Sequence, residues 1–484
     1  MAALGTIVAF GAYVPRLRLS RATIGAAVGW LHPPNKAPAS GARSFCNWDE
    51  DAITLAVEAA RSARAMASSE RVDALILAST SLPFADRDGA ALVAGALDLP
   101  ASLETFDVTS SLRAGTSALA NAARRPDAQM LIVASDARAA RAGSPQEGAF
   151  GHGAAAFLVR GANVAPTSNA LATILALEQT TSDFVDHYRA SGASFDYGLE
   201  ERWVREEGYG KLVTPAIAGA LRRANLVAGD IRHFLMPGPA DAVKRIVQAA
   251  QLTSASTPET LRALCGDTGA AHPLLMLAEA LERAQPGEHV LVVGFGQGVD
   301  VLIVRAEAAL ATLDSKPVQH TLARGLEESS YVRYLSHSGL LDVDFGMRAE
   351  RDNRTAQSVA WRKHREVTAF VGSRCGKCAT VQFPPSRVCV NPECRATDTQ
   401  KSHPLAGSTG RVKSFTEDWL AYAPRPPSIY GNIEFVEGGN LMMELTDVER
   451  GQLAVGDVVR FVFRVKDLDR PRGFKRYFWK ATRG

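Results

Sequence analysis

The sequence has no hydrophobic run long enough to cross a membrane. A spanning helix needs about 20 consecutive apolar residues, and no stretch of the 484 residues approaches that length. The first twenty residues also lack the pattern of a secretory signal, because their arginines follow the apolar stretch instead of preceding it. These absences predict a cytoplasmic protein that makes no membrane contact and begins with a β-strand.

The sequence also has little net charge and few aromatic residues. Its formal charge is +3 at pH 7, and aromatic residues make up 7% of the chain. Such a small excess of positive charge does not by itself indicate binding to nucleic acid or to a membrane surface. Hydrophobic residues reach 46% and charged residues 22%, which is typical of a globular protein with a large core. The length is that of about three domains.

Cysteine is scarce, and most of it lies in one place. Cys46 and Cys265 are isolated, which argues against a disulfide framework and for a reducing compartment. The other four have the spacing C-x2-C-x10-C-x4-C and are Cys375, Cys378, Cys389 and Cys394. Two close pairs of thiolates can surround one ion tetrahedrally, and zinc is the usual occupant. Because four protein ligands leave no place for water, we predict a structural zinc whose loss unfolds this segment.

Up to about residue 310, short apolar runs alternate with alanine-rich segments. The runs at 74–77, 130–133 and 289–293 are rich in leucine and β-branched residues, as expected for strands buried on both faces. The segments 52–67 and 273–284 place apolar residues at helical spacing. This alternation predicts a layered α/β fold.

The composition changes in the last third of the chain. Residues 307–365 are more polar and less periodic, and their charge-dense part is predicted to be a connecting segment. From about residue 405, short alternating runs such as 458–465 are separated by the turn sequences GSTG, APRPPS, EGGN and AVGD. This pattern predicts a small antiparallel barrel after the cysteine cluster.

Seven short segments of the first 350 residues form a recognisable series. They are 12–19 (AYVPRLRL), 47–52 (NWDEDA), 107–116 (DVTSSLRAGT), 151–157 (GHGAAAF), 182–184 (SDF), 266–271 (GDTGAA) and 331–345. In this order they resemble the thiolase superfamily and, within it, the short prokaryotic form of hydroxymethylglutaryl-CoA synthase. The resemblance implies a duplicated layered fold (αβαβα), with halves at 1–165 and 166–350, that dimerises through its central sheet.

The remaining residues resemble a domain that accompanies thiolases and these synthases. The resemblance implies a zinc ribbon at 365–400 and an OB fold at 401–484. In the family this domain bridges subunits and helps to hold acyl-CoA, which here implies acyl-CoA as a ligand and a thiolase-type protein as a partner. Because both parts occur in one chain, we interpret them as a fusion.

The family's condensation reaction needs a cysteine that takes the acyl group, a glutamate that removes a proton and a histidine that assists. The matching motifs put the cysteine at Leu112, the glutamate at Thr80 and the histidine at Leu235. A shifted register does not restore the first two, since 103–120 contains no cysteine and 76–90 contains no glutamate. The chain therefore lacks the condensing triad on this interpretation.

Four nearby residues are candidate substitutes for the lost side chains. Ser111 adjoins Leu112, although a capping or packing role is favoured for it, because adjacent side chains on a turn point in different directions. His233 would lie on the same strand face as Leu235. Asp267, at the family's asparagine position, and His272 could together exchange protons with a substrate carbonyl without an acyl-enzyme.

Three functions remain open. The favoured one is an acyl-CoA-binding scaffold or regulatory subunit that works with a thiolase-type enzyme. The alternative is an enzyme that breaks or forms C–C bonds of acyl-CoA, of the thiolase or retro-aldol type, with a non-standard active site. The least favoured is binding of single-stranded nucleic acid by the OB fold. Basic and aromatic residues alternate in 470–480 as that function requires, but 401–484 carries only 14 Lys/Arg against 10 Asp/Glu.

Overall fold

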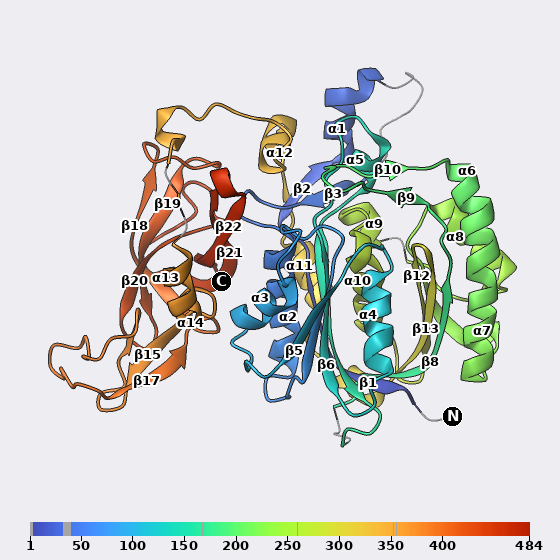
Figure 1. Cartoon of the computed structure of the whole chain (residues 1–484), viewed down its shortest axis with the longest axis horizontal. Coiled ribbons are helices and arrows are strands. Elements are labelled where there is room, and N and C mark those ends of the chain that lie inside the picture. Colours follow the sequence, from blue (N-terminus) through green and yellow to red (C-terminus); the bar gives the residue numbers. More distant parts are fainter. Residues whose placement is uncertain (1–2, 32–39, 166–168, 259, 352, 355) are drawn as a thin grey trace. The chain divides into compact units, whose positions relative to one another are not determined.

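The computed structural model describes residues 3–31, 40–165, 169–258, 260–351, 353–354 and 356–484. The chain divides into two compact units (Figure 1). The first contains residues 1–47, 51–91 and 101–341, and the second contains residues 48–50, 92–100 and 342–484. Within the described ranges, no helix combines the length and the apolar character needed to cross a membrane.

A nine-stranded sheet forms the centre of the first unit, in the order β11-β12-β13-β8-β1-β7-β6-β4-β5. The strands of its first half are β1 (Gly5–Tyr13), β4 (Ala74–Ala78), β5 (Glu104–Val108), β6 (Gln129–Asp136) and β7 (Gly153–Gly161). Those of its second half are β8 (Ala172–Thr181), β11 (Ile231–Leu235), β12 (His289–Phe295) and β13 (Gly298–Ala306). The apolar runs predicted to be strands are thus β4, β6 and β12.

The two halves of this sheet repeat one topology. In the first half β4 pairs with β6 in parallel, and β6–β7 and β7–β1 are antiparallel. In the second half β11 pairs with β12 in parallel, and β12–β13 and β13–β8 are antiparallel. The edge strand β5 corresponds in the second half to a single bridge between His233 and Ser256. The predicted duplication is therefore confirmed.

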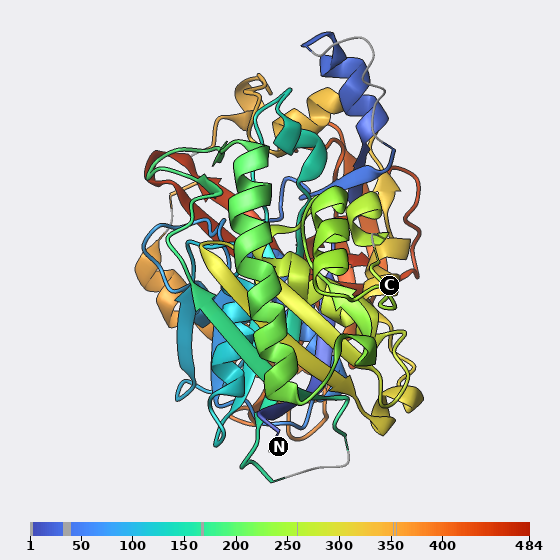
Figure 2. The ribbon, with the colours of Figure 1, turned by 90° about the vertical axis from the view of Figure 1, so that its right-hand side faces the viewer.

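Helices separate and cover the two halves. Helices α4 (Ala114–Ala123) and α10 (His272–Leu281) pack between them, while α2 (Ala52–Met66) covers the outer face of the first half (Figure 1). Helix α7 (Thr214–Ala224) covers the outer face of the second half (Figure 2). A Cβ atom on Gly115 would lie 2.3 Å from the carbonyl oxygen of Ala270, so α4 reaches the turn before α10 only because this residue has no side chain. The layers are those of the predicted αβαβα fold.

The remaining elements of the first unit lie in its loops and around its edges. Three short strands form a separate sheet, β2 (Leu17–Ser20), β3 (Ala42–Phe45) and β14 (Leu326–Glu327), and a hairpin is formed by β9 (His187–Tyr188) and β10 (Tyr197–Gly198). The other helices are α1 (Arg21–Val28), α5 (Pro145–Ala149), α6 (Glu201–Trp203) with a π-helical continuation at Val204–Val213, α8 (Ala240–Ala249), α9 (Thr260–Leu264), α11 (Pro317–Ala323) and α12 (Tyr331–His337). Helix α3 (Gly89–Ala96) contributes residues to both units.

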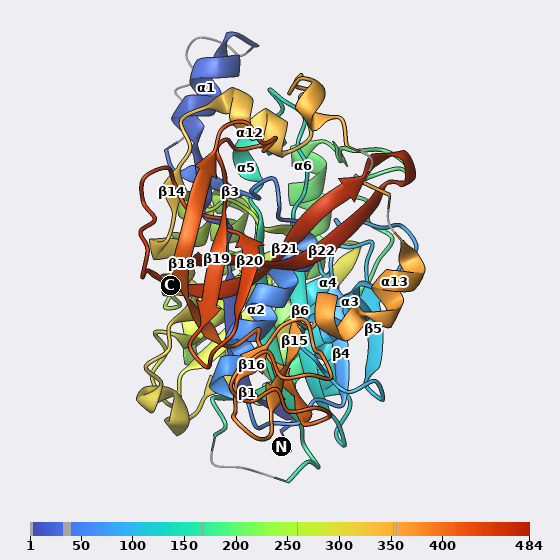
Figure 3. The same cartoon turned by 90° about the vertical axis from the view of Figure 1, so that its left-hand side faces the viewer.

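The second unit contains two small sheets (Figure 3). The first has the order β16-β15-β17, with β15 (Val371–Cys375), β16 (Val381–Gln382) and β17 (Gln400–Pro404). The second has the order β20-β19-β18-β21-β22, with β18 (Thr409–Asp418), β19 (Ser428–Phe435), β20 (Asn440–Glu444), β21 (Val458–Asp469) and β22 (Phe474–Arg483). These strands are antiparallel, and a bridge between Leu445 and Ala481 joins the end of β20 to β22. The zinc-ribbon and barrel predictions are confirmed.

The charge-dense segment after residue 344 is more ordered than a plain connection. It contains α13 (Gln357–Arg362) and α14 (His364–Val367), both in the second unit. Periodicity could not predict them, because helices of six and four residues show no complete apolar stripe.

A buried ion network explains why residues 48–50 belong to the second unit. Arg464 and Lys480 are almost fully buried on β21 and β22. Arg464 lies 3.1 Å from Glu50, and Lys480 lies 3.1 Å from Asp49. Removing one member of such a pair leaves an uncompensated buried charge, so this part of the NWDED segment stabilises the barrel.

Candidate functional site

A cavity of about 560 Å³ lies beyond the carboxyl ends of β4 and β5 in the first unit. Four segments line it: the loop after β4, the β5–α4 turn, the β9–β10 hairpin with the residues before it, and the β12–β13 turn. The structure thereby brings together two of the three predicted catalytic positions, Thr80 and Leu112. Ser111 lines the same cavity.

Thr80 is held by a buried carboxylate. Asp136, the last residue of β6, accepts hydrogen bonds from the Thr80 amide at 2.7 Å and from its hydroxyl at 2.9 Å. It also accepts hydrogen bonds from the hydroxyls of Ser79 and Ser81 and from the amide of Ala270. With five donors around it, this carboxylate fixes the loop after β4.

Leu112 lies on a turn whose backbone is constrained on both sides. Ser110 has φ = 71°, in the left-handed region that residues with a side chain rarely adopt. Ser111 donates a hydrogen bond to the carbonyl oxygen of Gly296 at 2.7 Å. The guanidinium of Arg113 lies 2.8 Å from the fully buried carboxylate of Asp300. The turn thus retains a defined geometry around an alkyl side chain.

Leu235 is placed differently from the other two predicted positions. It is the last residue of β11, has no exposed surface and packs in the core of the first unit. The residues after it, Met236 to Gly238, line a second cavity of only about 30 Å³ together with Asp267 and His272. Leu235 itself lines neither cavity.

Asp267, in the turn before α10, and His272, the first residue of α10, lie near each other and support the shape of this turn. Asp267 accepts a hydrogen bond from the Gly269 amide at 2.8 Å, and the Nδ1 atom of His272 accepts one from the Thr268 amide at 3.2 Å. Burial lowers the pKa of His272. Burial alone would raise the pKa of Asp267, but His272, Arg138 and the Gly269 amide lower it on balance. These bonds give both side chains a structural task.

His233 lies outside both cavities. Its Nε2 atom is 3.0 Å from a carboxylate oxygen of Glu288. The side chains of the pair retain 15% and 26% of their exposure. This is a partly exposed pair between His233 on the edge strand β11 and Glu288, the residue before β12.

The cavity contains an acid–base pair that sequence reasoning missed. Asp186 and His187 both line it, and the Nδ1 atom of His187 lies 2.9 Å from Oδ2 of Asp186. The other carboxylate oxygen of Asp186 is buried and has no hydrogen-bond partner within the described residues. The available signal was weak: the pair follows the family-like segment 182–184 by two residues, on a short hairpin that has no periodic pattern.

Arginine contacts fasten this hairpin to the loop that carries Thr80. Arg189 donates a hydrogen bond to the carbonyl oxygen of Thr80 and lies 2.8 Å from Asp196. Arg138 lies 2.5 Å from the same carboxylate, and both of these side chains are 4% exposed. Burial alone would raise the pKa of Asp196, but the two arginines lower it on balance. The hairpin therefore forms a fixed wall of the cavity.

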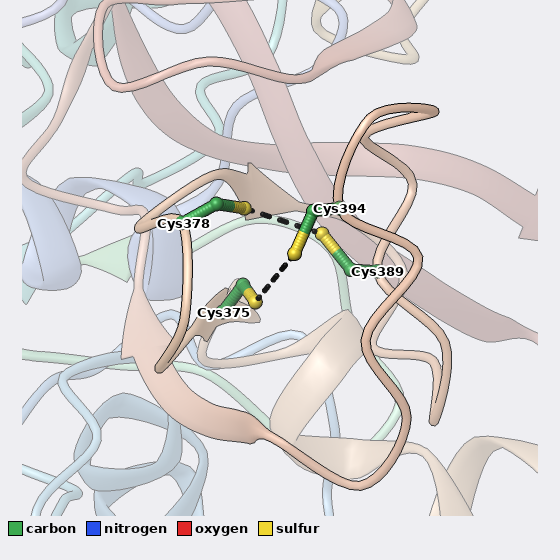
Figure 4. Close-up of side chains that lie close together, drawn as sticks. All are labelled: Cys375, Cys378, Cys389 and Cys394. Atoms are coloured by element: carbon green, nitrogen blue, oxygen red, sulfur yellow. Dashed lines mark hydrogen bonds between the residues drawn. The ribbon is translucent and has the colours of Figure 1, made fainter.

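The four clustered cysteines meet in the second unit (Figure 4). The sulfur atoms of Cys375 and Cys394 are 3.9 Å apart, those of Cys378 and Cys389 are 3.5 Å apart, and all four lie within 4.8 Å of one another. A tetrahedral zinc ion with Zn–S bonds of about 2.3 Å requires sulfur atoms about 3.8 Å apart. The set fits a zinc ion.

Three family models match parts of the chain. The C-terminal domain of 3-oxoacyl-[acyl-carrier-protein] synthase III matches residues 221–305. The rubredoxin-like zinc ribbon domain of ChsH2 matches 363–400, and the C-terminal OB-fold domain of ChsH2 matches 402–464.

Curated relatives and solved structures match the first unit. Hydroxymethylglutaryl-CoA synthase of Archaeoglobus fulgidus is 29% identical over 346 residues, which are 68% of this chain and 96% of the relative. The synthase of Aeropyrum pernix is 28% identical over 331 residues, 66% of this chain and 90% of the relative. A crystal structure of HMG-CoA synthase complexed with CoA has a TM-score of 0.57 at 18% identity, covering 74% of this chain and 95% of that one. FabH of Pseudomonas aeruginosa has a TM-score of 0.52 at 23% identity, covering 63% and 99%.

The chain is a hydroxymethylglutaryl-CoA synthase-like thiolase-fold protein fused to a ChsH2-type zinc ribbon and OB fold. In this synthase-like protein the 560 Å³ cavity contains a threonine and a leucine at two positions where the family's motifs lead us to expect a glutamate and a cysteine. Thr80 cannot remove a proton from carbon as a glutamate would, and Leu112 cannot carry an acyl group as a cysteine would.

Proposed function

We propose that the chain binds an acyl-CoA thioester in the 560 Å³ cavity and forms no acyl-enzyme at residue 112. The observation that carries this proposal is the coexistence of a retained polar cavity with an alkyl group at Leu112. Relatives with the same fold are CoA thioester synthases, and one related structure contains CoA. The cavity volume suits the acyl and thioester portion of such a ligand.

The neighbouring hydroxyl groups support binding without covalent catalysis. An acyl carrier needs a free nucleophile with a base beside it. The hydroxyl of Ser111 donates to a carbonyl oxygen at 2.7 Å, and that of Thr80 donates to Asp136 at 2.9 Å. Both hydroxyls thus donate their proton to an acceptor within the protein, so neither is a free nucleophile. Polar groups held in this way can still orient a thioester.

The second unit supports a role in a larger assembly. We propose that Cys375, Cys378, Cys389 and Cys394 bind a structural zinc ion, since the sulfur positions fit a closed tetrahedral site. We further propose that the ribbon and OB fold join the chain to a thiolase-type partner, with the first unit dimerising as the core. In this assembly the chain acts as an acyl-CoA-binding subunit in acyl-CoA metabolism.

One observation favours a second function. The Asp186–His187 pair lines the cavity, and within the described residues the second nitrogen of the histidine makes no hydrogen bond. Such a pair fits an enzyme that acts on C–H or C–C bonds of acyl-CoA without a covalent intermediate, for example by retro-aldol cleavage.

The binding proposal is tested with two matched tryptophan variants. Ala85 is exposed and lines the cavity, whereas Ala101 is exposed at the opposite end of β5. We expect Ala85→Trp to weaken acyl-CoA binding by at least about 10-fold, because the indole fills the cavity entrance. Ala101→Trp should bind as the native chain does.

Calorimetric titration with acetyl-, acetoacetyl- and octanoyl-CoA measures the affinity, and intact-mass spectrometry detects acylation. Equal affinity of both variants would place the ligand elsewhere. An acylated peptide that contains residues 107–116 would contradict the absence of an acyl-enzyme.

A further inference from the structure

We infer that His187, oriented by Asp186, is a general base that removes a proton from the α-carbon of the acyl-CoA bound in the cavity. This inference rests on the proposed function, because it requires the thioester to bind in the cavity. It adds a residue and a reaction type to that binding.

The geometry of the pair is that of an oriented imidazole base. The Nδ1 atom of His187 lies 2.9 Å from Asp186, and the two side chains retain 23% and 13% of their exposure. A carboxylate that accepts the Nδ1 proton selects the tautomer in which Nε2 carries a free lone pair. The second nitrogen is then ready to accept a proton, as in other His–carboxylate pairs.

The surroundings hold the pair in place. Asp196 connects Arg189 on the hairpin to Arg138, and Arg189 also donates to the carbonyl oxygen of Thr80. The hairpin is therefore tied to the loop where the family's glutamate is predicted. His187 on this hairpin lines the same cavity as Thr80 and Leu112. It can therefore act on a ligand whose thioester lies beside these two residues.

The other histidines near the site are less suitable bases. His233 has a carboxylate partner at 3.0 Å but lines neither cavity. His272 lines the 30 Å³ cavity, and its Nδ1 atom already accepts the Thr268 amide. His152 is buried, and its Nδ1 atom accepts the Cys46 amide at 3.0 Å.

The proposed step balances without a further reactant. A Cα–H bond of the acyl group breaks, the proton goes to Nε2 of His187, and the electron pair moves onto the thioester oxygen as an enolate. Helix α4 begins at Ala114, two residues after Leu112, and the positive end of its dipole favours such a negative charge. Return of a proton to Cα restores the thioester, and in D2O a deuteron returns instead.

Deuterium exchange tests this step directly. The full-length chain is incubated in D2O with acetyl-, propionyl- or octanoyl-CoA, and deuterium at Cα is measured by mass spectrometry, while calorimetry measures affinity. We expect exchange with the native chain and a loss of about 100-fold or more in His187→Gln. Affinity should change by less than about 3-fold, because uniform binding is not removed.

Asp186→Asn tests the positioning role of the carboxylate. We expect it to lower the maximal exchange rate about 10-fold while the KM for exchange stays the same, because only orientation of the base is lost. A purely structural role would weaken binding as well. His289→Gln is the control for loss of a histidine, since its Nδ1 atom lies 3.2 Å from the carbonyl oxygen of Asp230, outside the cavity.

The outcomes separate the two proposals. If none of the thioesters used in the calorimetric titrations or in the exchange experiment binds, the proposed function fails and this inference fails with it. If a thioester binds but no exchange occurs, or exchange continues in His187→Gln, only the inference is overturned. Loss of exchange in His233→Gln with normal exchange in His187→Gln would assign the base to His233 and overturn it as well.

Discussion

The cysteine cluster of the second unit and the cavity of the first unit differ in what they have kept. The cluster has all four side chains that a tetrahedral metal site requires, with sulfur atoms 3.5 to 3.9 Å apart across its two pairs. The cavity has kept a shaped space and a constrained turn, but its predicted nucleophile position is Leu112. The cavity thus has a constrained frame around a side chain, Leu112, that cannot form a thioester.

This contrast has a physical cause. If the four thiols bind zinc as proposed, the metal supplies folding free energy to the ribbon, and replacing any one of them should disrupt its structure. The frame of the cavity is stabilised by other residues, such as Asp136 and Asp300, which accept several hydrogen bonds each.

Removal of the metal should produce the largest effect. We expect Cys378→Ser to reduce zinc from one per chain to none and to unfold the ribbon, since structural zinc sites supply on the order of 10 kcal/mol of folding free energy. Metal analysis and limited proteolysis around residues 371–404 measure the change. Cys265→Ala, at a buried cysteine outside the cluster, should keep its zinc; retention of zinc by Cys378→Ser would contradict the metal site.

Breaking the Arg113–Asp300 ion pair beside Leu112 should have the next largest effect on stability. Asp300→Ala leaves Arg113 without its partner at 2.8 Å, and we expect a loss of about 3 kcal/mol in unfolding free energy, as for other buried pairs. Urea denaturation measures it. The exposed pair Arg202–Glu206 gives the control, because Glu206→Ala should cost about 0.5 kcal/mol or less. Equal losses of unfolding free energy in Asp300→Ala and Glu206→Ala would show that the Arg113–Asp300 pair does not stabilise the turn around Leu112.

The buried histidine of the GHGAAAF segment predicts a pH effect on the same frame. Burial, with Arg43 nearby, lowers the pKa of His152 to about 3. Below about pH 6.5 the unfolded chain binds a proton at His152, whereas the folded chain does not until the pH approaches 3. The free energy of unfolding is therefore highest above pH 6.5 and falls as the pH is lowered toward 3. The slope is about 1.4 kcal/mol per pH unit. Urea midpoints between pH 7 and 4 should fall less steeply in His152→Gln, and parallel curves would reject this cause.

Restoring a thiol should have the smallest effect on stability and the most direct effect on chemistry. We expect Leu112→Cys to take up one acetyl group from acetyl-CoA, because a thiol next to the N-terminus of α4 is activated by the helix dipole. Peptide mass spectrometry detects the acetyl group. Leu235→Cys serves as the comparison, since that side chain is fully buried in the core and should remain unmodified. Acetylation of neither variant would mean that the cavity does not present residue 112 to a thioester.

Much of the fold was predictable because its signals are local. The runs at 74–77, 130–133 and 289–293 became β4, β6 and β12, and the helical spacing of 52–67 and 273–284 became α2 and α10. Turn sequences and alternating residues likewise predicted the barrel. The short helices α13 and α14 were not predicted, since polar segments of this length have no apolar period.

The candidate site was predictable only in part. Thr80 and Leu112 follow strands that end side by side, since β4 pairs with β5 in parallel, so motif position sufficed to place them in one cavity. Leu235 ends a buried strand and lies in the core instead. The motif alone could not distinguish these cases, because side-chain direction at a strand end depends on what packs against it.

The sequence alone predicted the metal site, because the cysteine spacing is local. It also showed that residue 112 cannot carry an acyl group, because this residue is a leucine. Which histidine faces the cavity was decided by tertiary packing. His187 acquires its place in the cavity from a hairpin that Arg138, Arg189 and Asp196 fasten to the Thr80 loop. The Arg138–Asp196 and Arg189–Thr80 contacts join residues 58 and 109 positions apart in the chain, and no local pattern encodes such a distance.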